Sequence, residues 1–147
     1  MQLTSSAFVH NGFIPKEYSC DGSGAHPPLE WSGVPTEAKS LALIVDDPDA
    51  PAGLWTHWLL WNIDPKTFEI KAGEAPTGAV QGKTSSGENQ WCPPCPPAGT
   101  HHYRFKLYAL DSALALAPVS IQKELEAALQ GQVLGQTELV GLYARQK

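Results

Sequence analysis

Two short apolar segments constrain the fold more than any other feature of this sequence. Residues 40–47 (SLALIVDD) and 56–63 (THWLLWNI) are apolar on both faces of an extended chain, and each ends at Asp and Pro residues typical of turns. Segments of this length and composition are typical of central strands that are buried on both sides. The chain is therefore predicted to form a sheet that is covered on both faces.

A third strand is predicted over residues 101–111 (HHYRFKLYALD), which alternate between two faces. One face is formed by His101, Tyr103, Phe105, Leu107 and Ala109. Residues 67–100 are dominated by Gly, Pro, Thr, Ser and Gln and are interpreted mostly as loop, whereas residues 138–147 are interpreted as a last strand.

One helix is predicted over residues 121–130 (IQKELEAALQ), with Ser120 as its N-cap and Gly131 as its stop. The residues spaced for one face of this helix are Ile121, Leu125, Ala128 and Leu129. The 13 prolines and 13 glycines scattered along the chain favour many turns and few long helices. Residues 1–147 are accordingly expected to form a single, mainly β domain with one or two peripheral helices.

The charge balance argues against nucleic acid as a partner. The chain has 10 basic and 15 acidic residues, a net charge of −5 with neutral histidines, and no run rich in Lys or Arg. Its first residues, MQLTSSAFVHNGFIP, do not have the pattern of a signal peptide, and no apolar run is long enough to span a bilayer. A cytoplasmic protein without a membrane span is the expectation.

Residues 91–95 (WCPPC) look like the motif of a thiol–disulfide oxidoreductase. In such enzymes the first Cys lies at a helix N-terminus, whose dipole lowers the pKa of the thiol. The prolines and glycine within residues 94–99 exclude that helix, so the redox interpretation is disfavoured. Three cysteines are an odd count, and they are interpreted as small loop residues. A Cys92–Cys95 disulfide, or a pairing of Cys20, is left open.

Three polar clusters lie where predicted strands meet loops, at residues 46–51, 55–58 and 96–103. The ends of adjacent strands can bring such groups together into a pocket on a rigid scaffold. Asp47 follows a buried strand directly and therefore needs a donor, for which a histidine is the natural candidate. His57 taken alone is more simply a core histidine that is hydrogen-bonded to backbone.

Histidine and aspartate in a tryptophan-lined pocket suit the binding of a small anion. A histidine held protonated by an aspartate can bind phosphate, and the carboxylate can accept an ammonium or a hydroxyl. Such a pocket favours a small phosphorylated or zwitterionic group over a bare dianion, which the acids would repel. No motif for a metal ion and no G-x-S-x-G element for a hydrolase is found, and no cofactor is predicted.

The sequence resembles a known family in these same clusters. DDPDAP (46–51), WTHW (55–58) and CPPAGTHHYRFKLYALD (95–111) are similar to the bacterial branch of the phosphatidylethanolamine-binding, or Raf-kinase-inhibitor-like, proteins. GFIPKEYSCDGSGAHPPLEWSGVP (12–35) and LVGLYAR (139–145) extend the similarity over nearly the whole chain. The resemblance implies a large central antiparallel or mixed β-sheet packed on a smaller sheet, with one or two short helices.

The resemblance also implies a pocket for phosphate or phosphorylated headgroups. Carried over motif by motif, its ligand-binding residues are Asp47, Asp49, Ala50, Pro51, Trp55, His57, Pro97, His101 and Tyr103. Two positions depart from the family pattern. His102 stands where the family often has Arg. Pro93 replaces a glycine, which removes a backbone N–H and restricts φ in the loop 91–95 (WCPPC), interpreted as the rim of the pocket.

The function expected from these features is non-enzymatic binding of a small phosphorylated anion. One alternative is an inhibitor or regulator of a protein partner, a kinase or a protease, with the pocket as an effector site. A second is a hydrolase that uses His and Asp as acid and base. The resemblance to bacterial members of the family, which implies a homodimer, is the only basis for expecting one.

Overall fold

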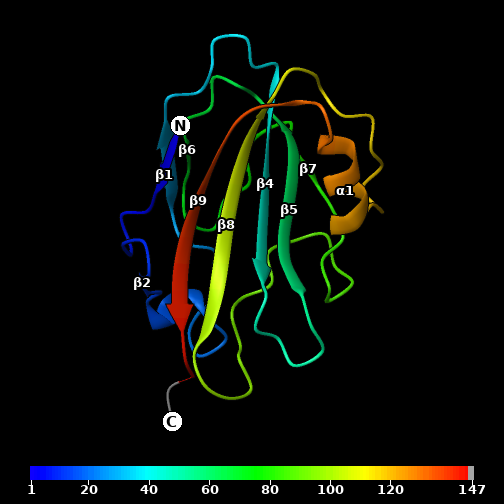
Figure 1. Cartoon of the computed structure of the whole chain (residues 1–147). Helices are drawn as coiled ribbons and strands as arrows, with labels where there is room; N and C mark the ends of the chain where they lie inside the picture. Colours follow the sequence, from blue (N-terminus) through cyan, green and yellow to red (C-terminus); the bar gives the residue numbers. More distant parts are fainter. Residues whose placement is uncertain (146–147) are drawn as a thin grey trace.

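The computed structural model describes residues 1–145 as two β-sheets with one α-helix at their side (Figure 1). The elements are β1 (Gln2–Thr4), β2 (Gly12–Phe13), the 3-10 helix Lys16–Tyr18, β3 (Leu29–Ser32), β4 (Ser40–Asp47), β5 (Trp55–Ile63), β6 (Glu69–Ile70), β7 (Val80–Gln81), β8 (His101–Leu110), α1 (Gln122–Leu129) and β9 (Val133–Tyr143). The larger sheet has the order β2-β9-β8-β4-β5-β7 and the smaller one β1-β3-β6. All pairs are antiparallel except β2 with β9, so the predicted mixed sheet on a smaller sheet is confirmed.

β4 lies in the middle of the larger sheet, between β5 and β8, and all eight of its residues are buried. Leu41, Leu43 and Val45 face the smaller sheet, whereas Ala42 and Ile44 face the helix. The prediction of a strand buried on both sides is therefore confirmed. The strands predicted over 56–63 and 101–111 are confirmed to within one residue.

Two apolar layers hold the elements together. The first lies between the sheets and joins Leu29, Trp31 and Ile70 of the smaller sheet to the apolar faces of β4, β5 and β8. The second lies under α1, where Leu125 and Leu129 pack on the opposite face of the larger sheet. Since burial of a large aliphatic side chain contributes about 1.5–3 kcal/mol, these layers supply the main driving force for folding.

The helix differs from its prediction at the N-terminus. Its N-cap is Ile121 rather than Ser120, because the backbone N–H of Ile121 is bonded to the Glu124 carboxylate while Ser120 closes a preceding turn with Ala117. Ile121 is 45 % exposed and is not part of the buried face. Gly131 has a φ of +75°, which favours glycine and ends the helix as predicted.

The last strand and the long loop are largely as predicted. β9 begins five residues before the predicted segment 138–147, and residues 146–147 of that segment lie outside the described residues. The loop over residues 67–100 is interrupted only by the two-residue strands β6 and β7. Within residues 1–145, no helix has the length and apolar character needed to cross a bilayer.

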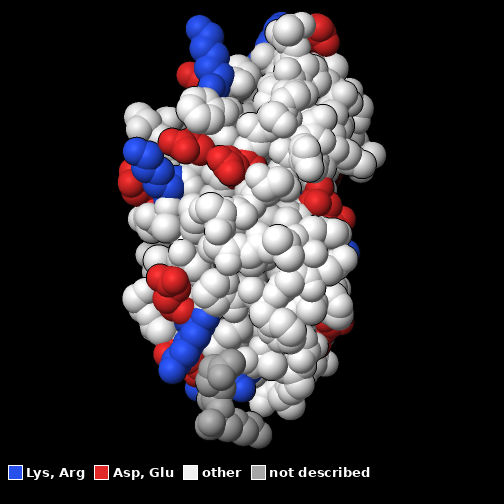
Figure 2. All heavy atoms as spheres, turned by 90° about the vertical axis from the view of Figure 1, so that its left-hand side faces the viewer, with Lys and Arg blue, Asp and Glu red and all other residues white. Residues whose placement is uncertain are grey.

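Charged side chains on the face beside β1 and β2 are scattered. Figure 2 shows Lys and Arg atoms apart from one another on this face, with acidic atoms close to most of them. A nucleic-acid-binding surface instead gathers its cations into a patch or stripe. The described residues of this face therefore form no basic patch of the kind that binds phosphate backbones.

A buried carboxylate connects the larger sheet to α1. Asp46 is fully buried and accepts hydrogen bonds from Arg104 Nε at 2.7 Å, Lys106 Nζ at 2.7 Å and Gln122 Nε2 at 2.8 Å. Burial by itself raises the pKa of this carboxyl, but the three donors outweigh it and hold the pKa below its usual value. Asp46 is thus an ionised group whose charge is compensated inside the fold.

We expect Asp46→Asn to lower the free energy of unfolding by about 3 kcal/mol, because Arg104 and Lys106 then face a neutral amide. Urea unfolding measures this. Since the folded-state pKa of Asp46 is lowered, its contribution is complete above the unfolded pKa of about 3.9 and is lost as the pH falls through the folded pKa. The difference from the wild type should therefore shrink only in acid. The exposed Asp111→Asn is the matched control, and an equal loss in both variants would contradict the prediction.

Candidate functional site

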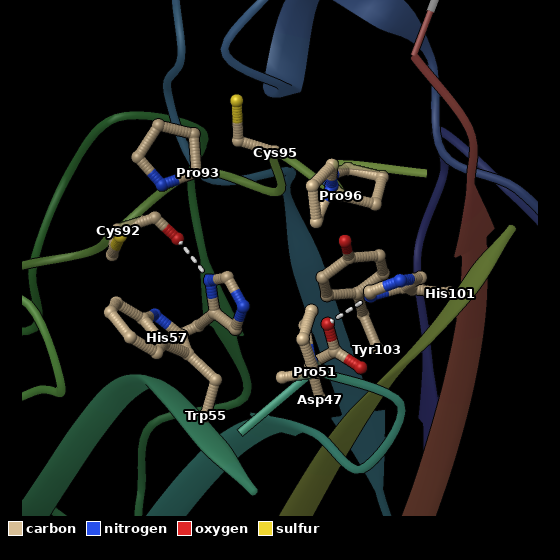
Figure 3. A pocket seen from close by; sticks show the side chains of 12 residues that line it. Asp47, Pro51, Trp55, His57, Cys92, Pro93, Cys95, Pro96, His101 and Tyr103 are labelled. Carbon is tan, nitrogen blue, oxygen red and sulfur yellow. Dashed lines mark hydrogen bonds and ion pairs between the residues drawn. The ribbon is translucent and has the colours of Figure 1, made fainter. Parts of the chain in front are cut away.

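A cavity of about 230 Å³ lies at the end of the larger sheet where β4 ends and β5 and β8 begin. It is lined by Asp47, Ala50, Pro51, Trp55, His57, Cys92, Pro93, Cys95, Pro96, Pro97, His101 and Tyr103. Prolines, Trp55 and Ala50 form apolar walls, and the few polar groups converge between them (Figure 3). Small-molecule sites commonly combine these two features.

His57 reaches the pocket through a β-bulge in β5. Opposite the consecutive residues Val45 and Asp46 of β4 stand Trp58 and Thr56, so His57 is an extra residue in the pairing. Strict alternation would direct His57 to the helix side, opposite to Trp58. The bulge turns it instead to the side of Trp58, where its ring meets Tyr103 edge-on at 5.2 Å between centroids. Bulges commonly re-aim a side chain in this way beside functional sites.

The loop at Cys92 fixes the orientation of His57. The backbone N–H of Cys92 donates to the carbonyl of His57 at 2.9 Å, and His57 Nδ1 lies 2.7 Å from the Cys92 carbonyl oxygen. Since a carbonyl oxygen can only accept, Nδ1 carries the proton. Burial lowers the pKa of His57, against the opposing effects of the Cys92 carbonyl and Asp47. The predicted backbone partner of His57 is therefore confirmed.

Asp47 and His101 form a buried pair at the opposite wall. His101 Nδ1 lies 2.6 Å from one carboxylate oxygen of Asp47, and the backbone N–H of Asp49 donates to the other at 2.7 Å. Both side chains are at least nine-tenths buried. The expectation that Asp47 would find a histidine donor is confirmed, and the pair is held rigidly because each carboxylate oxygen has a partner.

Tyr103 places a hydroxyl in the pocket. The hydroxyl is buried and has no hydrogen-bond partner among residues 1–145, and Figure 3 shows it pointing away from the sheet toward Pro96. Burial, aided by the charge of Asp47, raises the pKa of Tyr103, so the phenol keeps its proton. A buried hydroxyl without a partner costs free energy, which a bound acceptor would recover.

A family model described as phosphatidylethanolamine-binding protein matches residues 4–144. The chain belongs to the phosphatidylethanolamine-binding protein family. A UPF0098 protein of Methanothermobacter thermautotrophicus is 49% identical, with 99% of each chain covered, and one of Chlamydia muridarum is 48% identical over 97% of this chain and 98% of its own.

Two solved structures extend this similarity to the fold. The phosphatidylethanolamine-binding protein homologue CT736 of Chlamydia trachomatis has a TM-score of 0.95 and 45% identity, covering 99% of this chain and 97% of that one. YbcL of Escherichia coli, described as a member of the mammalian phosphatidylethanolamine-binding protein family, has a TM-score of 0.92 and 30% identity, covering 99% and 98%. The resemblance found in the sequence is therefore confirmed.

Eight of the nine residues carried over from the family line the pocket: Asp47, Ala50, Pro51, Trp55, His57, Pro97, His101 and Tyr103. Asp49 is not brought there. Its carboxylate accepts the backbone N–H of His102 at 2.8 Å and lies 2.6 Å from His102 Nδ1, outside the pocket. The hydrogen bond with the His102 side chain lowers the pKa of Asp49. His102 thus serves to hold the loop after β4 rather than to supply charge at the rim.

Four further residues line the pocket, Cys92, Pro93, Cys95 and Pro96, so the rim expected at residues 91–95 is confirmed, although none of the four was among the ligand-binding residues carried over from the family. Their signal in the sequence is the dense run of prolines, which forms a rigid wall. Pro93 packs against Gly24, whose added Cβ would lie 3.2 Å from the proline ring. Pro93, which departs from the family pattern, therefore packs this wall of the pocket against the loop that contains Gly24.

The structure places the three cysteines in loops, as expected, and decides the pairing that the sequence left open. Cys20 and Cys95 form a disulfide across 75 residues, whereas Cys92 is a free, half-buried thiol. The backbone N–H of Cys20 also donates to the carbonyl oxygen of Pro94 at 3.0 Å. The loop around Cys20 is therefore joined to the proline wall by a hydrogen bond as well as by the disulfide. Of the alternatives left open, the pairing of Cys20 is the one that forms. Within the described residues, no three His, Cys, Asp or Glu side chains converge as a metal site requires.

We expect one thiol to titrate in denaturant without reductant, because only Cys92 is free, and three after reduction. Burial raises the pKa of the Cys92 thiol, so its reaction in the folded protein should be slow. Cys92→Ser is the control and should leave no titratable thiol before reduction. Three reactive thiols in unreduced, denatured protein would contradict the Cys20–Cys95 bond.

Proposed function

We propose that this protein is a non-enzymatic binding protein that holds a small phosphorylated anion in the pocket between Asp47, His57 and His101. The buried Tyr103 hydroxyl carries the proposal, because it is a fixed donor that has no partner among residues 1–145. A bound oxyanion oxygen would accept this hydrogen bond, and charge-assisted bonds of this kind contribute about 1.5–3 kcal/mol. When both of its ring nitrogens carry protons, His101, oriented by Asp47, supplies a second donor from its other ring nitrogen.

The dimensions of the pocket support a small ligand. Its volume of about 230 Å³ lies below the range of about 300–1,000 Å³ typical of drug-sized ligands. A phosphate or a headgroup would fit this space, whereas acyl chains would have to remain outside. The apolar walls exclude water around the polar groups, which strengthens each hydrogen bond to an ion.

One observation favours binding over catalysis. The nucleophile candidate in the lining is the Cys92 thiol, whose pKa is raised by burial rather than lowered as a catalytic thiolate needs. A hydrolase remains an alternative that turnover of phosphoesters and esters would reveal.

A second candidate function is regulation of a protein partner. Leu54 and Trp55 are 50% and 37% exposed, and Trp55 also lines the pocket. An apolar rim of this kind can join a bound ligand to a partner surface. Reproducible recovery of one partner, dependent on Trp55, would favour this function, and the kinase or protease class of such a partner stays a prediction.

The predicted cytoplasmic location and the homodimer implied by the family also stay predictions. The Cys20–Cys95 bond bears on the location, because such bonds are rare in a reducing cytoplasm outside hyperthermophiles. The oxidised fraction of this bond in cells therefore tests the location, and light scattering tests the homodimer.

We expect inorganic phosphate to give saturable heat in isothermal titration, and Tyr103→Phe to weaken its binding about tenfold through loss of one hydrogen bond. His57→Ala and His101→Ala should weaken it as well. Tyr108→Phe is the matched control, because Tyr108 belongs to the same strand but packs against the layer under α1. No saturable heat with phosphate, phosphoethanolamine or a nucleotide, or unchanged binding in both histidine variants, would overturn the proposal.

A further inference from the structure

His57 presents a hydrogen-bond acceptor to the pocket. Because Nδ1 donates to the Cys92 carbonyl and burial keeps the ring neutral by lowering its pKa, the second ring nitrogen carries a lone pair. Figure 3 shows this nitrogen pointing away from Cys92, toward the side of the pocket that holds Asp47 and Tyr103. A ligand that contacts His57 here must donate a hydrogen bond to this nitrogen or leave its lone pair without a partner.

The other titratable groups around His57 are acids or are already paired. Asp46 and Asp47 approach it from β4, His101 and Tyr103 from β8, and Cys92 from the loop. A carboxylate has about four lone-pair sites, and Asp47 uses two of them on His101 and the Asp49 backbone. Asp47 is thus a second acceptor at this wall of the pocket.

The lining supplies little positive charge. None of the described residues that line it is Lys or Arg, and any charge on His101 is offset by Asp47. Arg104 and Lys106 lie on the opposite face of the sheet, bound to Asp46. A dianion would therefore face two acceptors, His57 and Asp47, beside the donors Tyr103 and His101. With no net positive charge in the lining, this is poor complementarity for a dianion.

We infer that the pocket takes a ligand that brings its own acidic proton: the monoanion of phosphate or of a phosphate monoester, rather than a dianion, a sulfate or a phosphate diester. This rests on the proposed function and adds to it the chemical class of the ligand. The P–OH group donates to His57 or Asp47, and the unprotonated oxygens accept from Tyr103 and from the doubly protonated ring of His101. One proton is thus shared between ligand and pocket without charging the buried His57.

The inference separates two sources of a phosphorylated group. An intact phospholipid headgroup is joined through a phosphate diester, which has no P–OH, whereas free phosphate and phosphate monoesters have one. A diester or a sulfate monoester is also a monoanion but has no proton to donate, so it can form a hydrogen bond with His57 only if His57 itself becomes protonated, and burial opposes this. The pocket is therefore expected to favour free monoesters over lipid-type diesters.

Methyl phosphate and methyl sulfate form a matched pair for the test, because they have the same shape but only the phosphate has a titratable proton. Isothermal titration from about pH 5.5 to about pH 8 should show methyl phosphate binding at least tenfold more tightly at the acid end. The ratio of the two affinities should fall about tenfold per pH unit above the second pKa of the monoester, which is about 6. In this ratio, the effects of protein groups whose titration changes both affinities equally cancel. Dimethyl phosphate should behave like methyl sulfate.

His57→Gln replaces the acceptor nitrogen by a possible hydrogen-bond donor, because the amide can turn its NH₂ toward the ligand. We expect this variant to bind methyl sulfate and methyl phosphate within about threefold of each other, with a ratio that no longer changes with pH. His102→Gln is the control, since His102 pairs with Asp49 outside the pocket, and it should keep the wild-type ratio.

The outcomes distinguish the inference from the function on which it rests. Equal binding of methyl phosphate, methyl sulfate and dimethyl phosphate at every pH would overturn the inference and leave anion binding intact. A wild-type ratio retained in His57→Gln would likewise overturn the role of His57. Failure of all three ligands and of inorganic phosphate to bind would overturn the proposed function itself.

Discussion

A strand buried on both faces must find a partner for every polar group that it carries, and β4 carries two consecutive carboxylates. Alternation directs Asp46 to the helix side and Asp47 to the pocket side. Asp46 is satisfied by Arg104 and Lys106 of β8 and by Gln122 of α1, and Asp47 by His101 of β8. The same requirement thus fixes the register of the central strands, attaches the helix and positions one wall of the pocket.

The opposite wall depends on backbone contacts rather than on charge. The bulge in β5 turns His57 toward the pocket, and the carbonyl and N–H of Cys92 hold it there. The loop that provides this carbonyl is in turn held by the Cys20–Cys95 bond and by the contact of Pro93 with Gly24. A histidine orientation is therefore set by a chain of contacts that reaches back to the early part of the sequence.

Local pattern made the strands and part of the site predictable, because alternation and burial act within a few residues. The faces of residues 101–110 and the need of Asp47 for a histidine follow from this alone. The bulge at His57 could not be predicted, since the extra residue appears only when β5 is paired with β4. The disulfide and the helix N-cap also depend on distant partners: Cys20 meets Cys95 through the fold, and Gln122 is drawn inward by Asp46.

The capacity of the pocket to recognise a ligand lies in what the fold leaves unused. Asp47, His57 and His101 each already have a partner that fixes their geometry, and each keeps at least one further hydrogen-bonding site, while the Tyr103 hydroxyl has no partner among residues 1–145. These remaining donors and acceptors are held rigid, so a ligand with the complementary set meets them with little ordering cost. The proton position on His57 is set by a backbone carbonyl, so a substitution of the Cys92 side chain that preserves the loop would leave this acceptor in place.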